Sequence, residues 1–276
     1  MPAVELNKLH DKLQDLAGSF SRPRDFLHGL RDFLETHADN GYRAGATMAQ
    51  QPILPSYRLP PLVSRHLEME LLNLTTAQPE LAFPVMDWLW LETFYEPRLY
   101  AVMMLGQIPL RLADDTLERL NAWADPREDR TILEALLDRG THCLRREGSD
   151  ALLEMYENWM VQNDPSVQAM GLRALLPLIN DNHFENIPPL FGMLFPLMRV
   201  APASLFNELA SVLSCLARRT PTETVYLFRQ VLSSPTTPNT ARLARRILTD
   251  LPPDQQSNLR AALRSHGSGS NPNPQS

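Results

Sequence analysis

A group of arginines near the C-terminal end of the sequence has the chemistry and the spacing to bind phosphate. Arg242, Arg245 and Arg246 stand at i, i+3 and i+4, so a helix would carry three guanidinium groups on one face. Arg218 and Arg219 lie at the end of an earlier predicted helix, the second one before this helix in the chain. If alternate helices line one surface, all five could form a stripe along a phosphate backbone. Alternatively, such arginines only offset helix macrodipoles and solvate the surface.

Other reactive side chains lack the spacing that catalysis or metal binding requires. Asp114 and Asp115 are neighbours at a predicted helix start, whereas a general acid and base need facing side chains. His142 precedes Cys143, but adjacent helical residues diverge by about 100°, and no third group orients the histidine. The sequence has no HExxH motif, no paired-cysteine spacing and no glycine-rich phosphate loop. We therefore expect no metal and no cofactor.

The elements that would position these side chains are helices. Apolar residues in segments 165–179, 205–216 and 244–251 recur at the spacing of one helix face, and no comparable alternating run indicates a sheet. The sequence suggests about a dozen helices joined by short polar turns, a rhythm typical of stacked helical hairpins. We predict an all-α fold, an open right-handed α-solenoid of HEAT-like helical hairpins.

Several helix starts are marked by a capping residue followed by proline. Thr220–Glu223 and Asp125–Glu128 both have the pattern of a capping box with proline at the first helical position. Asp164 followed by Pro165 has the pattern of a simpler cap. Prolines in this sequence are therefore expected to begin helices rather than to break them.

Composition divides the chain into four parts. Residues 1–40 are predicted to form an N-terminal helical pair, and 41–61, which contain glycines, polar residues and four prolines, an extended connection. Residues 62–266 would form the HEAT-like repeat array. The low-complexity tail, 267–276, is expected to be disordered.

The charge of the chain is uneven along its length. The 276 residues carry a formal net charge of -6. Met1–Pro165 contains 16 Lys and Arg against 26 Asp and Glu, whereas Ser166–Ser276 contains 10 against 6. With two cysteines, no apolar leader and no membrane-length apolar run, we expect a cytoplasmic protein that does not contact the membrane. The basic C-terminal part favours an anionic partner.

A family resemblance extends over residues 59–263. The segments LPPLVSRHLEMELL, DWLWLETFYEPRLYAVMMLG, NAWADP and YENWMVQNDPSVQAMGLRALLPLI follow one another in an order that resembles the DNA alkylation repair family of HEAT-like repeat proteins. The resemblance implies a concave groove that holds DNA. In the alkylpurine DNA glycosylases of this family, aromatic residues and one aspartate contact the damaged nucleotide there.

The family's site residues match this sequence only in part. Trp123 matches a tryptophan that stands four residues before the aspartate, but Arg127 occupies the aspartate position, and the nearest carboxylates are Asp125 and Asp129. A second tryptophan of the family is replaced by leucine and cysteine in SVLSCLARRTP. Arg173 matches the groove arginine, although it could also pair locally.

Three functions remain open at this point. The first is a non-catalytic binding scaffold whose groove holds DNA or a protein partner, and the missing aspartate and tryptophan favour it. The second is a DNA glycosylase that excises alkylated purines, with Trp123, Asp125 and Asp129 as its catalytic candidates. The third is a protein–protein adaptor without a DNA role. The residues predicted to bind DNA or a partner are Arg173, Arg218, Arg219, Arg242, Arg245 and Arg246.

Overall fold

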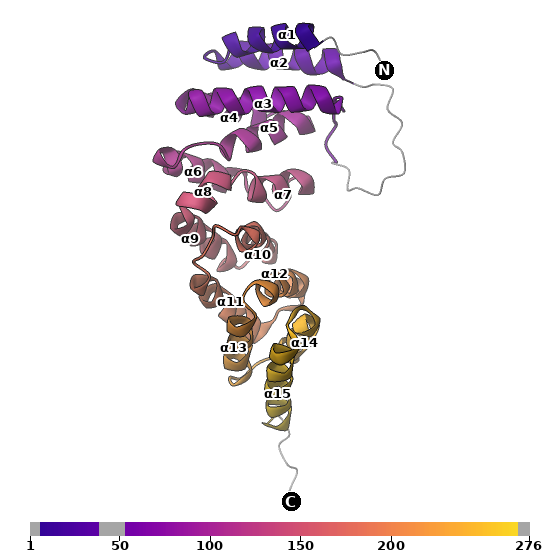
Figure 1. Cartoon of the computed structure of the whole chain (residues 1–276), viewed down its shortest axis with the longest axis vertical. Coiled ribbons are helices and arrows are strands. Elements are labelled where there is room, and N and C mark those ends of the chain that lie inside the picture. Colours follow the sequence, from indigo (N-terminus) through magenta and orange to yellow (C-terminus); the bar gives the residue numbers. More distant parts are fainter. Residues whose placement is uncertain (1–5, 39–52, 270–276) are drawn as a thin grey trace, which may run out of the picture. The chain divides into compact units, whose positions relative to one another are not determined.

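The computed structural model describes residues 6–38 and 53–269, and in these residues every regular element is a helix. Figure 1 shows the helices in chain order. This confirms the predicted all-α class. The chain divides into two compact units, unit 1 (Met1–Gly148) and unit 2 (Ser149–Ser276). Among the helices described, none is long and apolar enough to cross a membrane.

Unit 1 is built from helices that contact their second neighbours along the chain. α3 lies between α1 and α5, α5 also contacts α7, and α2 contacts α4. An ion pair between Arg119 and Asp87, 2.8 Å, joins α6 to α4. The elements are α1 (Leu6–Gly18), α2 (Pro23–His37), α3 (Pro61–Ala77), α4 (Pro79–Trp90), α5 (Tyr95–Leu105), η1 (Leu110–Leu112), α6 (Ala113–Trp123), α7 (Arg130–Asp138) and α8 (His142–Glu147).

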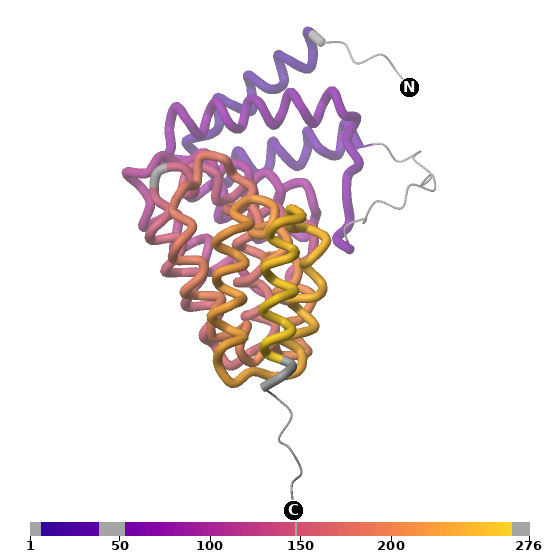
Figure 2. The backbone as a smooth tube through the Cα atoms, turned by 60° about the horizontal axis from the view of Figure 1, so that its bottom comes forward, coloured from indigo at the N-terminus to yellow at the C-terminus, as the bar shows by residue number. Residues whose placement is uncertain are grey.

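Unit 2 has the same alternation. α12 contacts both α10 and α14, while α13 contacts both α11 and α15. Figure 2 shows the orange and yellow helices of this unit side by side. The elements are α9 (Ser149–Met160), α10 (Pro165–Asn180), α11 (Pro188–Val200), η2 (Ala203–Leu205), α12 (Phe206–Arg219), α13 (Pro221–Leu232), α14 (Pro238–Ile247), η3 (Leu248–Asp250) and α15 (Pro253–Gly269).

The predicted helix starts are partly correct. Asp164 caps α10 by accepting a hydrogen bond from the Ser166 N–H, as expected. The Thr220 side chain makes no cap bond, because its hydroxyl is directed back to the helix carbonyl of Leu216. The prediction for Asp125 is wrong, since that carboxylate accepts from Arg127 within a turn. The next helix begins five residues later, with Asp129 as its cap.

The predicted domain boundaries are only partly within the described residues. α1 and α2 lie in the predicted N-terminal pair, and the described end of the 41–61 connection, residues 53–60, contains no helix. The division between the two units falls inside the predicted 62–266 array. α15 includes the first three residues of the predicted 267–276 tail, and the rest of that tail lies outside the described residues.

Candidate functional site

The candidate site is the exposed face of α14 in unit 2. Leu243, Ala244 and Ile247 are buried on one side of this helix, which packs on α12. The amphipathic spacing therefore turns Arg242, Arg245 and Arg246 outward, and all three are exposed. No acidic residue occurs within α14 itself. The helix thus presents three positive charges that its own side chains do not neutralise.

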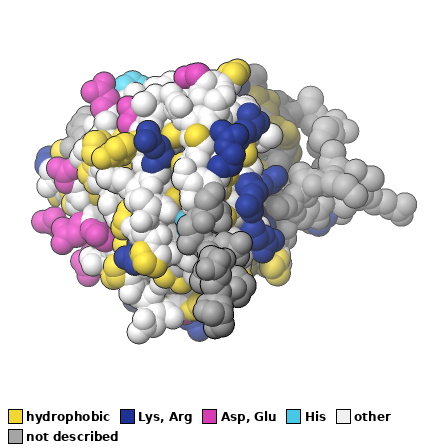
Figure 3. Space-filling view, turned by 90° about the horizontal axis from the view of Figure 1, so that it is seen from below, with side chains coloured by type: hydrophobic (Ala, Val, Ile, Leu, Met, Phe, Trp, Pro, Cys, Tyr) yellow, Lys and Arg dark blue, Asp and Glu magenta, His cyan; other side chains and the backbone are white. Residues whose placement is uncertain are grey.

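The α14 arginines differ in the contacts that they make. The Arg242 guanidinium carbon lies 5.3 Å from the centroid of the Phe206 ring, and its Nη1 donates to the Asn239 side chain at 3.2 Å. Within residues 6–38 and 53–269, the side chains of Arg245 and Arg246 have no hydrogen-bond or ion-pair partner. Figure 3 shows Lys and Arg side chains gathered on one part of a molecular face. Two guanidinium groups of α14 are therefore available to a ligand.

The two arginines that end α12 are engaged within unit 2. Arg218 forms an ion pair with Asp250 at 2.8 Å. Arg219 is half-buried and donates to the carbonyl oxygens of Leu178, at 3.4 Å, and of Asp181, at 2.9 Å. It also donates to the carbonyls of Ile179 and Phe184. Arg219 thus satisfies carbonyl groups at the end of α10, which its sequence position did not reveal.

Arg173 has a similar internal partner. Its guanidinium lies 3.0 Å from the Glu208 carboxylate, and this ion pair joins α10 to α12. Of the predicted binding residues, Arg173 and Arg218 have ion-pair partners and Arg219 donates to backbone carbonyls, whereas those on α14 have neither kind of contact among the described residues. The structure therefore places Arg242, Arg245 and Arg246 on one exposed helix face, whereas Arg173, Arg218 and Arg219 are engaged in contacts within unit 2.

The aromatic candidate for lesion binding is part of the core of unit 1. Trp123 is 7% exposed, and its ring stacks on that of Trp90 with centroids 4.7 Å apart and planes 8° from parallel. The Arg98 guanidinium lies over the Trp90 ring, with its carbon 5.5 Å from the ring centroid. Such a stacked pair stabilises the fold through its buried apolar area and through the contact between the rings. The two indoles hold α4 against α6.

Asp125 lies near Trp123 in sequence and is paired with an arginine. Arg127 Nη2 donates to Asp125 Oδ2 at 2.7 Å, and the Arg127 N–H donates to Oδ1 at 2.9 Å. These side-chain and backbone hydrogen bonds lower the Asp125 pKa to about 2. The carboxylate is therefore ionised near neutral pH, but its strongest interaction is with a residue of its own turn.

Asp129, the remaining catalytic candidate, is buried and has hydrogen bonds to both carboxylate oxygens. Oδ1 accepts from the N–H groups of Thr131, at 2.8 Å, and Ile132, at 3.3 Å. Asp129 thereby caps α7. Oδ2 accepts from the N–H groups of Ile53, at 2.6 Å, and Leu54, at 3.4 Å. Burial raises the Asp129 pKa, but the hydrogen bonds from Thr131 and the backbone outweigh it, and the net shift is downward. These contacts assign it a structural role.

Residues 53–58 are fixed by a second buried carboxylate that sequence reasoning missed. Glu96 is 7% exposed and accepts from the Tyr57 N–H at 3.0 Å and the Arg58 N–H at 2.9 Å. Its Oε1 also accepts from the Ser56 hydroxyl at 2.6 Å. The only local signal was a glutamate in the first turn of α5, and its partners lie about 40 positions earlier.

Comparisons with known proteins do not extend these observations. The chain matches no family model, and no curated protein matches it. The crystal structure of an engineered protein from a structural genomics consortium aligns over 97% of this chain and 94% of its own, with 14% identity and a TM-score of 0.27. In the described residues, no cluster of three or more His, Cys, Asp or Glu side chains could hold a metal ion.

Proposed function

We propose that this protein is a non-catalytic helical-repeat scaffold that binds the phosphate backbone of DNA through α14. The observation that carries the proposal is the pair of exposed arginines, Arg245 and Arg246, which have no partner in the described residues and share their helix with no carboxylate. Guanidinium groups form charge-assisted hydrogen bonds with phosphate oxygens. Arg242 lies one turn earlier on the same helix.

The proposed architecture is a right-handed α-solenoid of HEAT-like hairpins, related to the DNA alkylation repair family. The alternation of contacts, α10 to α12 to α14 and α11 to α13 to α15, supports stacked hairpins within unit 2. The resemblance of residues 59–263 to that family supports DNA as the partner. The composition of the chain supports a cytoplasmic location for such a scaffold.

The excision candidates of unit 1 have structural contacts that favour a scaffold without catalysis. Excision of an alkylated base would require an aromatic face and a carboxylate that can approach the nucleotide. Trp123 is instead stacked on Trp90, and Asp129 is occupied by N–H groups from two segments. These contacts give both residues an adequate structural reason to be where they are. They support a scaffold rather than a glycosylase.

A double charge reversal on α14 tests the proposal. We expect the combination of Arg245→Glu and Arg246→Glu to lower affinity for a labelled undamaged DNA duplex by more than about tenfold, because attraction is replaced by repulsion. The melting temperature should remain unchanged, because both side chains are exposed. Fluorescence anisotropy measures the affinity, and calorimetry measures the melting temperature.

The matched control reverses two other exposed arginines of unit 2. Arg199→Glu with Arg260→Glu changes the net charge by the same amount but leaves α14 intact. It should retain most of the DNA affinity. Equal loss in both double variants would show that the overall charge, and not α14, governs binding. If DNA does not bind at all but an acidic protein does, and only the α14 reversal removes it, the adaptor function is correct instead.

A further inference from the structure

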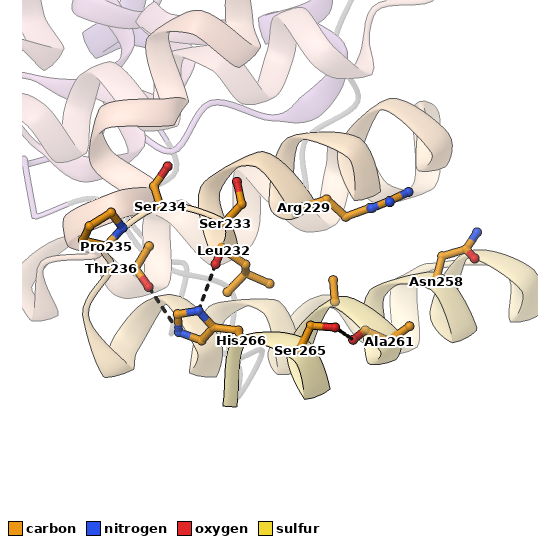
Figure 4. Close-up of a pocket in the computed structure, with 11 residues that line it drawn as sticks. Arg229, Leu232, Ser233, Ser234, Pro235, Thr236, Asn258, Ala261, Ser265 and His266 are labelled. Atoms are coloured by element: carbon orange, nitrogen blue, oxygen red, sulfur yellow. Dashed lines mark hydrogen bonds between the residues drawn. The ribbon is translucent and has the colours of Figure 1, made fainter. Parts of the chain in front are cut away.

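Unit 2 contains a hollow between α13 and α15 that is separate from the α14 arginines. Its volume is about 860 Å³, and it is open to solvent. The end of α13, the turn that follows and one side of α15 form its walls (Figure 4). This volume is within the range of about 300–1,000 Å³ that is usual for small-molecule sites.

The charge of the lining is positive. Arg229 projects from α13, and neither Asp nor Glu occurs among the residues that line the hollow. Arg229 is exposed and has no hydrogen-bond or ion-pair partner within the described part of the chain. Its side chain extends along the hollow toward the end at which Asn258 lies (Figure 4). A cation in an open hollow without a counter-charge favours an anionic ligand.

His266 fixes the opposite end of the hollow. Its Nδ1 lies 2.9 Å from the Leu232 carbonyl oxygen, which can only accept, so this nitrogen carries a hydrogen. Its Nε2 lies 3.4 Å from the Thr236 hydroxyl. Both contacts join α15 to the end of α13 and the turn after it, as Figure 4 shows. The wall is therefore held in place by side chains from both sides.

The remaining lining combines hydroxyl groups with a small apolar surface. Ser233 and Ser265 direct their hydroxyls to helix carbonyls, at 2.8 and 3.2 Å, so both groups already have acceptors within their own helices. Leu232 and Ala261 add apolar contact area. The hollow thus offers a guanidinium to an acidic group, and hydrocarbon to the body that carries it.

We propose that this hollow binds a small organic phosphate monoester. The phosphoryl group would contact Arg229, and the organic body would lie on Leu232 and Ala261. A phosphate monoester fits better than a carboxylate because it brings up to about two negative charges to Arg229, which has no acidic residue beside it in the lining. The site does not depend on α14 or on DNA.

Titration of the intact protein with phenyl phosphate tests this site. Phenol and inorganic phosphate are the controls that each lack one half of the ligand. Phenyl phosphate should saturate, shift the ¹⁵N resonance of Arg229 Nε, and bind about tenfold more tightly than either control, because both halves contribute. If inorganic phosphate bound with the same affinity as phenyl phosphate, that result would contradict a role for Leu232 and Ala261.

Two variants test separately the charge of Arg229 and the open volume of the hollow. Arg229→Gln should weaken phenyl phosphate binding by about tenfold, since a charge-assisted hydrogen bond is lost. Ala262→Trp should abolish binding by filling the hollow. Arg199→Gln, at an exposed position outside the lining, should have no effect. Should Ala262→Trp lower the melting temperature, Arg229→Gln decides alone, because its side chain is exposed.

The α14 variant keeps this inference distinct from the proposed function. Arg245→Glu with Arg246→Glu should bind phenyl phosphate as the parent does, even if it no longer binds DNA. Absence of saturation by phenyl phosphate, or unchanged affinity in Arg229→Gln, would overturn the inference. Loss of phenyl phosphate binding in the α14 variant would also overturn it, because the anion would then be bound at α14.

Discussion

The Asp129 carboxylate joins two segments that lie far apart in the chain. Its Oδ1 caps α7, and its Oδ2 accepts from the Ile53 and Leu54 N–H groups, 76 and 75 positions earlier. An amide in place of the carboxylate can keep the cap, but it offers the N–H groups of Ile53 and Leu54 a weaker, uncharged acceptor or a hydrogen. The stability of unit 1 should therefore depend on the ionised carboxylate.

Asp129→Asn should lower the free energy of unfolding by about 1–3 kcal/mol near neutral pH, since the N–H groups of Ile53 and Leu54 lose their charged acceptor. The folded-state pKa of Asp129 is below the ordinary 3.8, so the stabilisation is complete above 3.8 and is lost as pH falls through the lower folded value. Urea unfolding at about pH 7 and about pH 3 measures both. A difference from the parent that does not shrink in acid would contradict this role.

Substitutions of Trp123 test whether its indole serves in packing or in catalysis. Trp123→Ala should lower the free energy of unfolding by about 3–5 kcal/mol, because a buried indole and its stack on Trp90 are removed. Trp123→Phe should recover part of the loss. Urea denaturation measures both. Release of alkylated base by the parent, together with loss of that release in a fully stable Trp123→Phe variant, would support excision instead.

At the scale of elements, the helices were predictable and their partners were not. The spacing of apolar residues in 165–179 predicts one buried helix face, and α10 buries it. A local pattern also predicts the Asp164 cap, because the acceptor and its donor are two residues apart. The same spacing is misleading at Asp125, whose carboxylate also accepts from the N–H two residues later but within a turn rather than at a helix start. The role of Arg219 depends on carbonyl groups 35–41 positions earlier, which no local spacing encodes.

The junction of α5 with the end of α7 depends on a close approach at a glycine. A Cβ added at Gly106 would lie 1.9 Å from the Arg139 carbonyl oxygen, whereas one added at Gly192 in α11 would meet no atom within 4 Å. Gly106→Ala should therefore lower the free energy of unfolding by about 1–3 kcal/mol through overpacking. Gly192→Ala should raise it by about 0.5–1 kcal/mol, because alanine favours the helix.

Denaturant titration of both glycine variants measures the two effects with opposite signs. Each substitution adds the same methyl group, so a general effect of alanine cannot produce the difference. Equal changes in the two variants would show that the close contact at Gly106 relaxes at little cost. The prediction tests how closely the elements of unit 1 are packed at this junction.

At the scale of the whole molecule, the division into units changes the interpretation of charge. With the boundary at Gly148, unit 2 contains 10 Lys and Arg against 10 Asp and Glu, and unit 1 contains 16 against 22. The basic excess that appears after Pro165 therefore does not make unit 2 basic as a whole. Under the scaffold proposal, attraction for DNA therefore comes from the local field of α14, which salt screens strongly.

The most direct test of the scaffold account is the affinity of the intact protein for a labelled undamaged duplex, measured by fluorescence anisotropy at several salt concentrations. Three phosphate contacts from α14 predict saturable binding with a slope of log affinity against log salt of about −2 to −3. A second duplex with a positively charged alkylated-base analogue should bind equally well. Absence of binding at low salt, or a strong preference for the damaged duplex, would contradict a backbone-binding scaffold.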